Sequence, residues 1–324
     1  MSNSSAVSLG SLRIQAQQKA DMENNPFIST SEWNNYINQS YKELYDMLVS
    51  AYGNEYYVAN TYTFQTSGAT QYSLPDGTPS FVDDSGQTAQ KFYKLLGVDL
   101  QYSASPSGYV SLRRFEFIER NKYAYPNTTI NTNGYTNLRY RINGDKLFLI
   151  PIPSSGQSTR IWYVPAPTNL QYVLPSSVTT SSTTVTMTST AGLAIGMNVS
   201  GPGLTTVQAN TVISTLTSTS MALSLPTTLT NPSAILSYWS DSTTMEGISG
   251  WEEYVVIDAA IKAQIKQESD FQPLMVQKQE MKQRIESMAE GRDIGQAHHV
   301  SDVLSLNNFE GMFGNSSGFD GGGW

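Results

Sequence analysis

The sequence has no cysteine and only two histidines among its 324 residues. Without cysteine the chain has neither disulfides nor thiolate chemistry, which is compatible with a reducing cytosol but leaves the compartment open. The two histidines, His298 and His299, are neighbours in a glycine-rich segment, so a Ser-His-Asp or Cys-His arrangement has no base in a folded pocket. Adjacent histidines can contribute to a metal site, but no carboxylate or thiolate cluster stands near them, and solvent exposure is the favoured interpretation.

Long apolar runs and an excess of basic charge are also missing. No apolar run approaches the roughly 18 residues that a membrane span needs, and the first residues lack the basic and apolar regions of a signal peptide. We therefore expect a soluble protein made in the cytoplasm. The net charge of −8 and the pI of about 4.8 give no reason to expect a protein that wraps nucleic acid. An acidic protein could still line a passage through which DNA slides.

Carboxylates outside the predicted helices are the remaining candidates for chemistry, and each has a simpler explanation. Asp83 and Asp84 could bind a cation weakly, but a solvated turn is favoured. Glu116 and Glu119 could form an acid–base pair, but salt-bridged surface is the default for them. The basic residues that match them are Arg113, Arg114 and Arg120. No phosphate-binding glycine pattern occurs in a strand–helix context. We expect no catalysis, no cofactor and no metal.

Charge is absent from one long stretch of the chain. Asp, Glu, Lys and Arg do not occur from Ile161 to Ser240, although they make up 14% of all residues. Short β-branched segments punctuated by glycine and proline predict a small sandwich or barrel, placed at residues 173–240. A disordered linker is the alternative, against which the regularly spaced Val, Ile, Leu and Met argue. Inserting a domain costs little when its ends lie close together, so Tyr163–Pro167 and Tyr238–Asp241 should be neighbours.

Helical periodicity is found near the two ends of the sequence. Ser8 could cap a short first helix. Ser29 and Glu32 have the spacing of a capping box, and apolar residues then recur at helical intervals over Glu32–Tyr52. This pattern predicts an amphipathic helix.

A second helical region follows the uncharged stretch. Ser249 and Glu252 repeat the capping-box spacing before a helix that should end near Glu268. Asp270 is placed to cap another helix that continues to Gly291. Two adjacent helices joined by a short turn predict an antiparallel hairpin.

Between the first helices and the uncharged stretch the period changes to two, which predicts strands and hairpins. The clearest hairpin joins Leu138–Ile142 to Lys146–Ile150 through Asn143-Gly144, a pair that favours a type I′ turn. The segment Leu112–Lys122 fits either a strand or a short charged helix.

Together these patterns predict an α+β fold. N-terminal helices (residues 1–55) and a C-terminal helix hairpin (241–297) form a bundle, with a β-rich region (56–172), the inserted sandwich-like β domain (173–240) and a flexible glycine-rich tail (298–324). The residues expected in the core and assembly contacts of the bundle are Trp33, Ile37, Leu44, Leu48, Trp251, Tyr254, Val255, Ile261, Ile265, Met281 and Ile285.

Outside the insert, several segments follow one another in a recognisable order. They are STSEWNNYINQSYKELYDMLVSAYG, YKLLGVDL, LRRFEFIERN, YRINGDKLFLIPIP, WYVPAP, GWEEYVVIDAAIKAQIKQESD and LMVQKQEMKQRIESMAEGRD. This series resembles the head-to-tail adaptor (connector, neck) proteins of tailed bacteriophages. The resemblance covers most of the chain outside roughly residues 173–240 and the last twenty-odd residues, and no single motif carries it.

The resemblance implies a fold and a function. N-terminal helices would pack on the C-terminal helix hairpin, with the β region between them. The protein would be made in the host cytoplasm and assemble in the virion neck as a ring, commonly of twelve subunits, which extends the DNA channel. The implied partners are further copies of this chain, the portal protein, a tail or nozzle protein, and passing DNA that is not bound sequence-specifically. Tail fibres are candidate partners of the β insert.

The glycine-rich tail carries spaced apolar residues, which suit an anchor that becomes ordered on binding. By resemblance the anchor would dock on the portal. The residues concerned are Phe309, Met312, Phe313, Phe319 and Trp324. A plain disordered end is the alternative.

A different class of function is also open. The Thr-rich insert and the abundant Tyr and Trp would suit a host-surface or glycan-binding module of the virion, associated with the tail or its fibres. A virion enzyme is disfavoured by the histidine count.

Overall fold

The computed structural model describes residues 7–23, 25–51, 60–78, 80–83, 86–104, 107–122, 138–204, 211–245 and 250–290. Within these residues the fold is mostly β, with four α-helices, fourteen strands in three sheets and a helical fraction of only 28%. The expected class, an α+β fold built from a helical bundle, a β-rich middle region and an inserted β domain, is therefore wrong, because the helical bundle does not dominate the fold. Helical periodicity is conspicuous at the two ends of the chain, whereas the strands occupy its long middle in short segments whose individual patterns are weaker.

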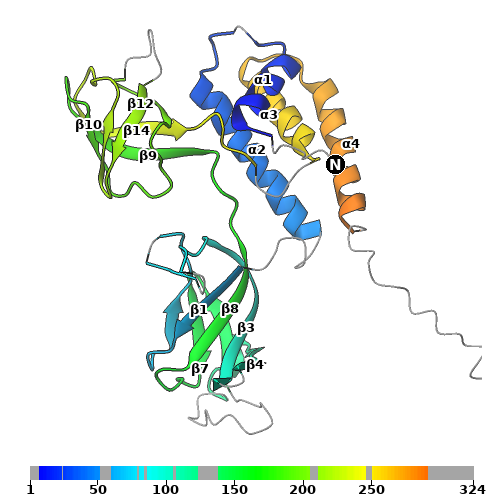
Figure 1. Ribbon diagram of the computed structural model, residues 1–324. Coiled ribbons are helices and arrows are strands. Elements are labelled where there is room, and N and C mark those ends of the chain that lie inside the picture. The colour runs from blue at the N-terminus through cyan, green and yellow to red at the C-terminus, as the bar shows by residue number, and fades with distance from the viewer. Residues whose placement is uncertain are drawn as a thin grey trace, which may run out of the picture.

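The four helices form one helical unit from segments far apart in the sequence (Figure 1). They are α1 (Leu9–Lys19), α2 (Thr30–Ala51), α3 (Glu252–Lys266) and α4 (Gln272–Glu290). The helix predicted at Glu32–Tyr52 is confirmed as α2, and the predicted helix hairpin as α3 and α4. Buried apolar side chains of all four helices belong to a single core.

Side-chain caps explain where three of these helices begin. Ser8, Ser29 and Asp270 each accept a hydrogen bond from a backbone N–H of the first turn, at 3.0 to 3.3 Å. Each cap pairs an N–H group that has no partner within its helix. The polar residues that precede the apolar patterns therefore set the three helix starts.

A second body, the β-sheet unit, consists of two four-stranded sheets. Their strand orders are β1-β8-β3-β4 and β2-β7-β6-β5, and apolar side chains from both sheets share one core between them. All pairs are antiparallel except β5 with β6. The strands are β1 (Asn60–Gln65), β2 (Gln71–Ser73), β3 (Phe92–Ala104), β4 (Ser107–Ser111), β5 (Arg113–Arg114), β6 (Arg139–Asn143), β7 (Lys146–Ile150) and β8 (Ser158–Pro165).

The predicted β6–β7 hairpin is present, but its turn differs from the prediction by one residue. Asn143 pairs with Lys146, so Gly144 and Asp145 are the two loop residues. Only Gly144 of the two has a positive φ, 60°. A positive φ at the first central position alone is the pattern of a type II′ turn, not of the type I′ turn that Asn-Gly favours.

The uncharged stretch folds into a closed six-stranded barrel, one of the two architectures predicted from its pattern, and not into the sandwich-like domain of the predicted fold class. The strand order is β10-β13-β12-β11-β14-β9, and β9 also pairs with β10, so the row of strands closes without a free edge. Val185, Leu236 and Tyr238 are among the side chains that fill its interior. The strands are β9 (Gln171–Val178), β10 (Thr184–Thr186), β11 (Asn198–Ser200), β12 (Thr211–Leu216), β13 (Ser220–Leu223) and β14 (Asn231–Trp239).

The barrel connects to the rest of the molecule through its first and last strands, which lie side by side. Gln171 of β9 is the register partner of Trp239 of β14. This pairing places the two ends of the barrel next to each other, as expected for an inserted domain. The backbone N–H of Leu170 donates to Oδ1 of Asn38, a buried residue of α2, at 2.9 Å. The entrance to the barrel is therefore held against the helical unit.

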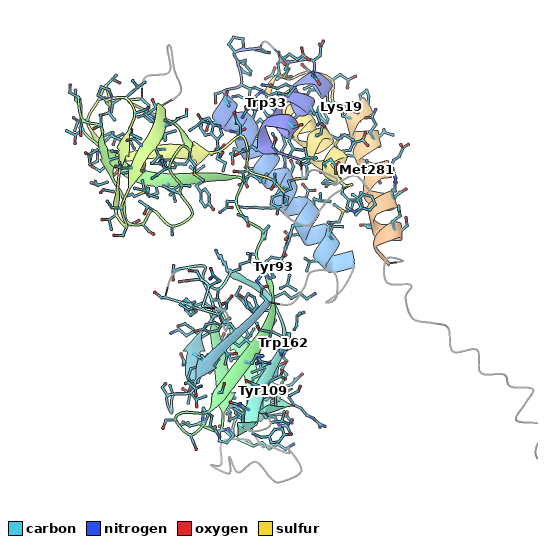
Figure 2. All side chains as sticks on the ribbon, viewed as in Figure 1. Lys19, Trp33, Tyr93, Tyr109, Trp162 and Met281 are labelled. Atoms are coloured by element: carbon cyan, nitrogen blue, oxygen red, sulfur yellow. The ribbon has the colours of Figure 1, made fainter. Side chains whose placement is uncertain are left out.

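The β-sheet unit contacts α2 through Tyr93 of β3 (Figure 2). The Tyr93 hydroxyl donates to Oδ1 of Asp46 at 2.5 Å, and its ring meets that of Tyr45 edge-on at 5.7 Å. The Tyr45 hydroxyl in turn donates to the carbonyl of Pro165, the last residue of β8. Burial, followed by the Asp46 carboxylate, raises the pKa of Tyr93 to about 12, so this hydroxyl remains a donor at neutral pH.

Candidate functional site

A cluster of charged side chains lies inside the helical unit. Asp258 of α3 is only 3% exposed. Its Oδ2 lies 2.6 Å from Nζ of Lys262 and accepts a hydrogen bond of 2.6 Å from the Ser40 hydroxyl. Its Oδ1 lies 2.8 Å from Nζ of Lys278. Because these residues come from α2, α3 and α4, the cluster ties three helices together.

Two further residues extend the cluster toward the surface. Lys278 Nζ lies 3.0 Å from Oε1 of Glu43, and the Tyr254 hydroxyl donates to the same oxygen at 2.8 Å. Burial, then the hydrogen bond to Glu43, raises the pKa of Tyr254, so the phenol stays protonated. Burial alone would lower the pKa of Lys278, but its bonds to Asp258 and Glu43 outweigh burial and leave that pKa raised.

Asp258 is ionised in spite of its burial. Burial by itself raises the pKa of a carboxyl group, but the hydrogen bonds from Lys262, Lys278 and Ser40 outweigh it. The pKa of Asp258 therefore lies below its ordinary value, and the interior of the helical unit holds a compensated negative charge.

The cluster also contains the geometry of a nucleophile beside a base. Nζ of Lys262 lies 3.0 Å from Oγ of Ser40, a distance typical of an activated hydroxyl. Ser40, however, is completely buried, and its hydroxyl also lies 2.8 Å from the backbone carbonyl of Tyr36. No substrate atom can approach Oγ, and Lys262 is ion-paired with Asp258. The cluster therefore acts as a structural clamp that holds three helices together, not as a catalytic site. The clamp consists of Ser40, Glu43, Tyr254, Asp258, Lys262 and Lys278.

The clamp predicts a specific dependence of stability on pH. Because the folded pKa of Asp258 lies below its ordinary value of 3.8, the stability it contributes is present above roughly pH 5 and is lost as the pH falls through the folded pKa. We expect the difference in urea stability between the wild type and Asp258→Asn to shrink steadily below roughly pH 4. A difference that stays constant down to acid unfolding would contradict the assignment.

Most residues predicted for the bundle core are buried in the structure. Met281 is half-buried and packs against the same core. The buried ones are Trp33, Ile37, Leu44, Leu48, Trp251, Tyr254, Val255, Ile261 and Ile285. The structure brings them together from α2, α3, α4 and the residue preceding α3.

One member of that set lies elsewhere. Ile265, which the helical spacing places on the inner stripe, is 52% exposed. Residues four apart differ by about 40° in direction around a helix, so a series with this spacing gradually turns away from the buried face. The buried face of α3 runs through Ile261 and Ala263 instead, and Ile265 belongs to the surface.

Sequence reasoning missed Asp258, the most buried charge described in the structure. The signal was present, because a lone acidic residue interrupts the apolar run Tyr254–Ile261 and Lys262 follows at the spacing of a helical ion pair. The contribution of Lys278 could not be predicted in the same way, since it depends on how α4 folds back.

The loop carboxylates take structural roles. Oδ1 of Asp83 accepts the backbone N–H of Gln87 at 2.9 Å, which shapes a turn, while Asp84 lies outside the described residues. Segment Leu112–Lys122 contains both strand β5 and the 3₁₀ turn η1 (Phe117–Glu119). Glu119 pairs with Lys122 at 3.4 Å on the surface. Among the described residues no group of three or more His, Cys, Asp and Glu could hold a metal ion.

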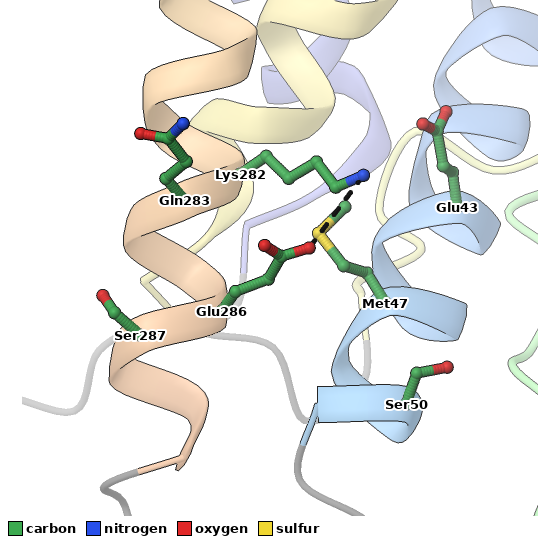
Figure 3. A pocket seen from close by; sticks show the side chains of 7 residues that line it. All are labelled: Glu43, Met47, Ser50, Lys282, Gln283, Glu286 and Ser287. Atoms are coloured by element: carbon green, nitrogen blue, oxygen red, sulfur yellow. Dashed lines mark ion pairs between the residues drawn. The ribbon is translucent and has the colours of Figure 1, made fainter.

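A groove opens between α2 and α4 beside the clamp (Figure 3). Its volume is about 700 Å³. Lys282 and Glu286 of α4 face it and form a weak ion pair at 3.9 Å. The remaining lining residues are Glu43, Met47, Ser50, Gln283 and Ser287. The lining combines charges of both signs with neutral polar groups and a single apolar residue, Met47, which gives this groove no distinctive ligand chemistry.

Two predicted elements lie outside the described residues, namely His298 with His299 and the tail residues Phe309, Met312, Phe313, Phe319 and Trp324. In the described part of the chain no helix is both long and apolar enough to cross a membrane. A scan against known protein families finds no match, and a search of curated proteins finds no significantly similar sequence. The functional assignment therefore depends on the chain itself.

Proposed function

We propose that this chain is a structural subunit of the head-to-tail adaptor of a tailed bacteriophage, forming a ring beneath the portal. The observation that carries the proposal is the helical unit, which joins α1 and α2 to α3 and α4 across the whole β region. The resemblance to adaptor proteins implies this order of segments. The mostly β composition comes from the β-sheet unit and the barrel, which project from the helical unit (Figure 1).

Apolar side chains on the outside of the helical unit support an assembled state. Val276 of α4 is 59% exposed and Phe27, before α2, is 55% exposed. Other exposed apolar residues of this unit are Ile14, Ile265, Met275 and Met288. A ring subunit needs such contacts beyond its own core, because each copy must present complementary faces to two neighbours.

The charge distribution suits a channel wall rather than a nucleic-acid clamp. The net charge is −8. The lysines of the clamp are neutralised by Asp258 and Glu43 rather than offered to phosphates. In the proposed ring, DNA passes without being held by sequence-specific contacts.

Ring formation can be tested directly. We expect size exclusion with light scattering, together with negative-stain imaging, to show rings or oligomers that depend on added portal. The alternative, a glycan-binding virion module, predicts a stable monomer that binds glycan and does not bind the portal protein. The three aromatic residues of the barrel, Tyr172, Tyr238 and Trp239, all pack against apolar cores, which leaves this alternative without an exposed stacking platform in the described part of the insert.

A charge placed on α4 should disrupt the ring. We expect Val276→Glu to reduce oligomer formation at least about tenfold, because it introduces an unpaired charge into an apolar contact. Gln277→Glu is the matched control, since it adds the same charge to an exposed position turned about 100° away from Val276 around the same helix. Equal assembly of the two variants, with unchanged helical circular dichroism, would show that α4 does not face a neighbouring copy.

The segment after residue 305 is assigned the portal-docking role. Removing residues 306–324 should weaken docking on the portal without changing the folded units. Unchanged affinity of the truncated protein for the portal would overturn this role.

A further inference from the structure

An apolar pocket lies on the outer face of the second sheet of the β-sheet unit, where Phe148 and Ile150 alternate with the buried core residues Leu147 and Leu149. Phe115, Phe117, Phe148 and Ile150 form its apolar wall, and its volume is about 250 Å³. Phe117 is 57% exposed, although aromatic rings are the side chains that gain most from burial. The remaining lining residues are Thr70, Arg120, Arg141 and Asn143.

Two arginines stand over this wall. The guanidinium carbon of Arg120 lies 4.5 Å from the centre of the Phe117 ring, and that of Arg141 lies 5.5 Å from it. Nη1 of Arg120 also donates to the carbonyl of Phe117 at 3.1 Å, which holds the group in place. Neither guanidinium is ion-paired with a carboxylate of the described residues. The pocket therefore offers an apolar floor with two positive charges at its rim that no carboxylate in the described part of the chain neutralises.

The size of the pocket suits one side chain. Small-molecule sites usually measure about 300–1,000 Å³, and a cavity of about 150 Å³ is enough for a benzene ring. An aromatic side chain followed by a carboxylate would place its ring against Phe117 and Phe148 and its charge against Arg120 and Arg141.

That chemistry occurs twice in the glycine-rich part of this chain. Phe309-Glu310-Gly311 and Phe319-Asp320-Gly321 each join an aromatic ring, a carboxylate and a glycine. From residue 293 onward the chain has four acidic residues and no lysine or arginine. The glycine allows the backbone to approach a wall closely because it has no side chain.

Other parts of the chain fit less well. Residues 123–137, which follow η1 in the sequence, contain tyrosines but no Asp or Glu to meet the arginines. Residues 309–321 can reach distant positions, since the chain between Glu290 and Phe309 spans up to about 60 Å when extended, twice the diameter of a small domain.

We propose that the pocket of Phe117, Phe148, Arg120 and Arg141 binds residues 309–321 of this chain through a Phe–carboxylate–Gly unit. The contact forms in the protein on its own and does not rest on the adaptor role. It gives the β-sheet unit a docking function for the chain's own aromatic segment.

The absence of cysteine from the chain makes a direct test possible. In the full chain, Thr70→Cys at the pocket is combined with Gly311→Cys or with Gly321→Cys. The matched control carries Thr188→Cys, at an exposed position of the barrel, instead of Thr70→Cys. Under mild oxidation we expect Cys at position 70 to form a disulfide with at least one of the two partners about tenfold faster than Cys at position 188 does. The mass on a non-reducing gel tells whether the bond lies within one chain or between two.

Reversing the charges separates docking from random collision. Adding Arg120→Glu and Arg141→Glu should slow disulfide formation about tenfold, and Glu310→Arg with Asp320→Arg should restore it in that background. Equal rates of disulfide formation for the Thr70 and Thr188 pairs would overturn the proposal. A rate that is unchanged by Arg120→Glu and Arg141→Glu would overturn it as well. An unchanged circular dichroism spectrum of the charge-reversal variants would show that they fold like the wild type. A failure of ring formation would leave the result of this test unaffected.

Discussion

Replacing Asp258 by alanine is expected to destabilise the helical unit by about 3–5 kcal/mol. The substitution leaves Lys262 and Lys278 without the carboxylate that lies 2.6 and 2.8 Å from them, and the Ser40 hydroxyl loses an acceptor in a buried position. Urea unfolding followed by the helical circular dichroism signal measures the effect, because the four α-helices of the described residues all belong to this unit.

Two controls show whether burial is the reason. Asp241 forms an ion pair with Arg13 at 2.8 Å, but its side chain is 49% exposed, so Asp241→Ala should change stability by less than about 1 kcal/mol. Removing both lysines as well, with Lys262→Met and Lys278→Met added to Asp258→Ala, should recover part of the loss because no buried charge is left unpaired; Glu43, which loses Lys278, is 46% exposed and remains solvated. Equal effects of Asp258→Ala and Asp241→Ala would rule out the clamp as the main source of stability.

The second large effect is expected in the barrel. Leu236 of β14 is completely buried in the barrel interior, and Leu236→Ala should destabilise the barrel by about 2–5 kcal/mol through lost burial and the cavity left behind. Since the barrel has its own core, the loss should appear as faster amide hydrogen exchange in β9 and β14, with the helical unit unaffected.

The neighbouring residue supplies the control. Ile235 precedes Leu236 on the same strand but points outward and is 61% exposed. Ile235→Ala should change stability by no more than about 0.5 kcal/mol. If the two variants behaved alike, the inside and outside of β14 would have been assigned incorrectly.

The helices could be predicted from the sequence because their signals are local. The caps at Ser29 and Asp270 and the apolar spacing that follows them lie within a few residues of each other. The closure of the barrel could not be predicted in this way. It depends on β9 pairing with both β14 and β10, and the same short uncharged strands would serve a sandwich equally well.

In the clamp and the pocket, too, the local contacts could be predicted from the sequence and the contacts between distant segments could not. Asp258 and Lys262 have a spacing that predicts a helical ion pair, but the third partner, Lys278, comes from another helix. The pocket combines Phe117 on η1 with Arg141 and Phe148 on the β6–β7 hairpin, and residues 118–140 separate them. Such combinations depend on tertiary pairing rather than on any pattern within one segment.

The division of the helical unit between the two ends of the chain has a consequence for synthesis on the ribosome. The barrel strands are complete at Trp239, before α3 has been made, whereas α2 ends at Ala51 and its partner begins at Glu252. Synthesis proceeds at roughly 5–20 residues per second, so the apolar faces of α1 and α2 stay uncovered for about 10–40 s until α3 and α4 have been made. The two β bodies can be finished first, so the helical unit is the last to close, and the nascent chain is most prone to aggregate through its N-terminal helices.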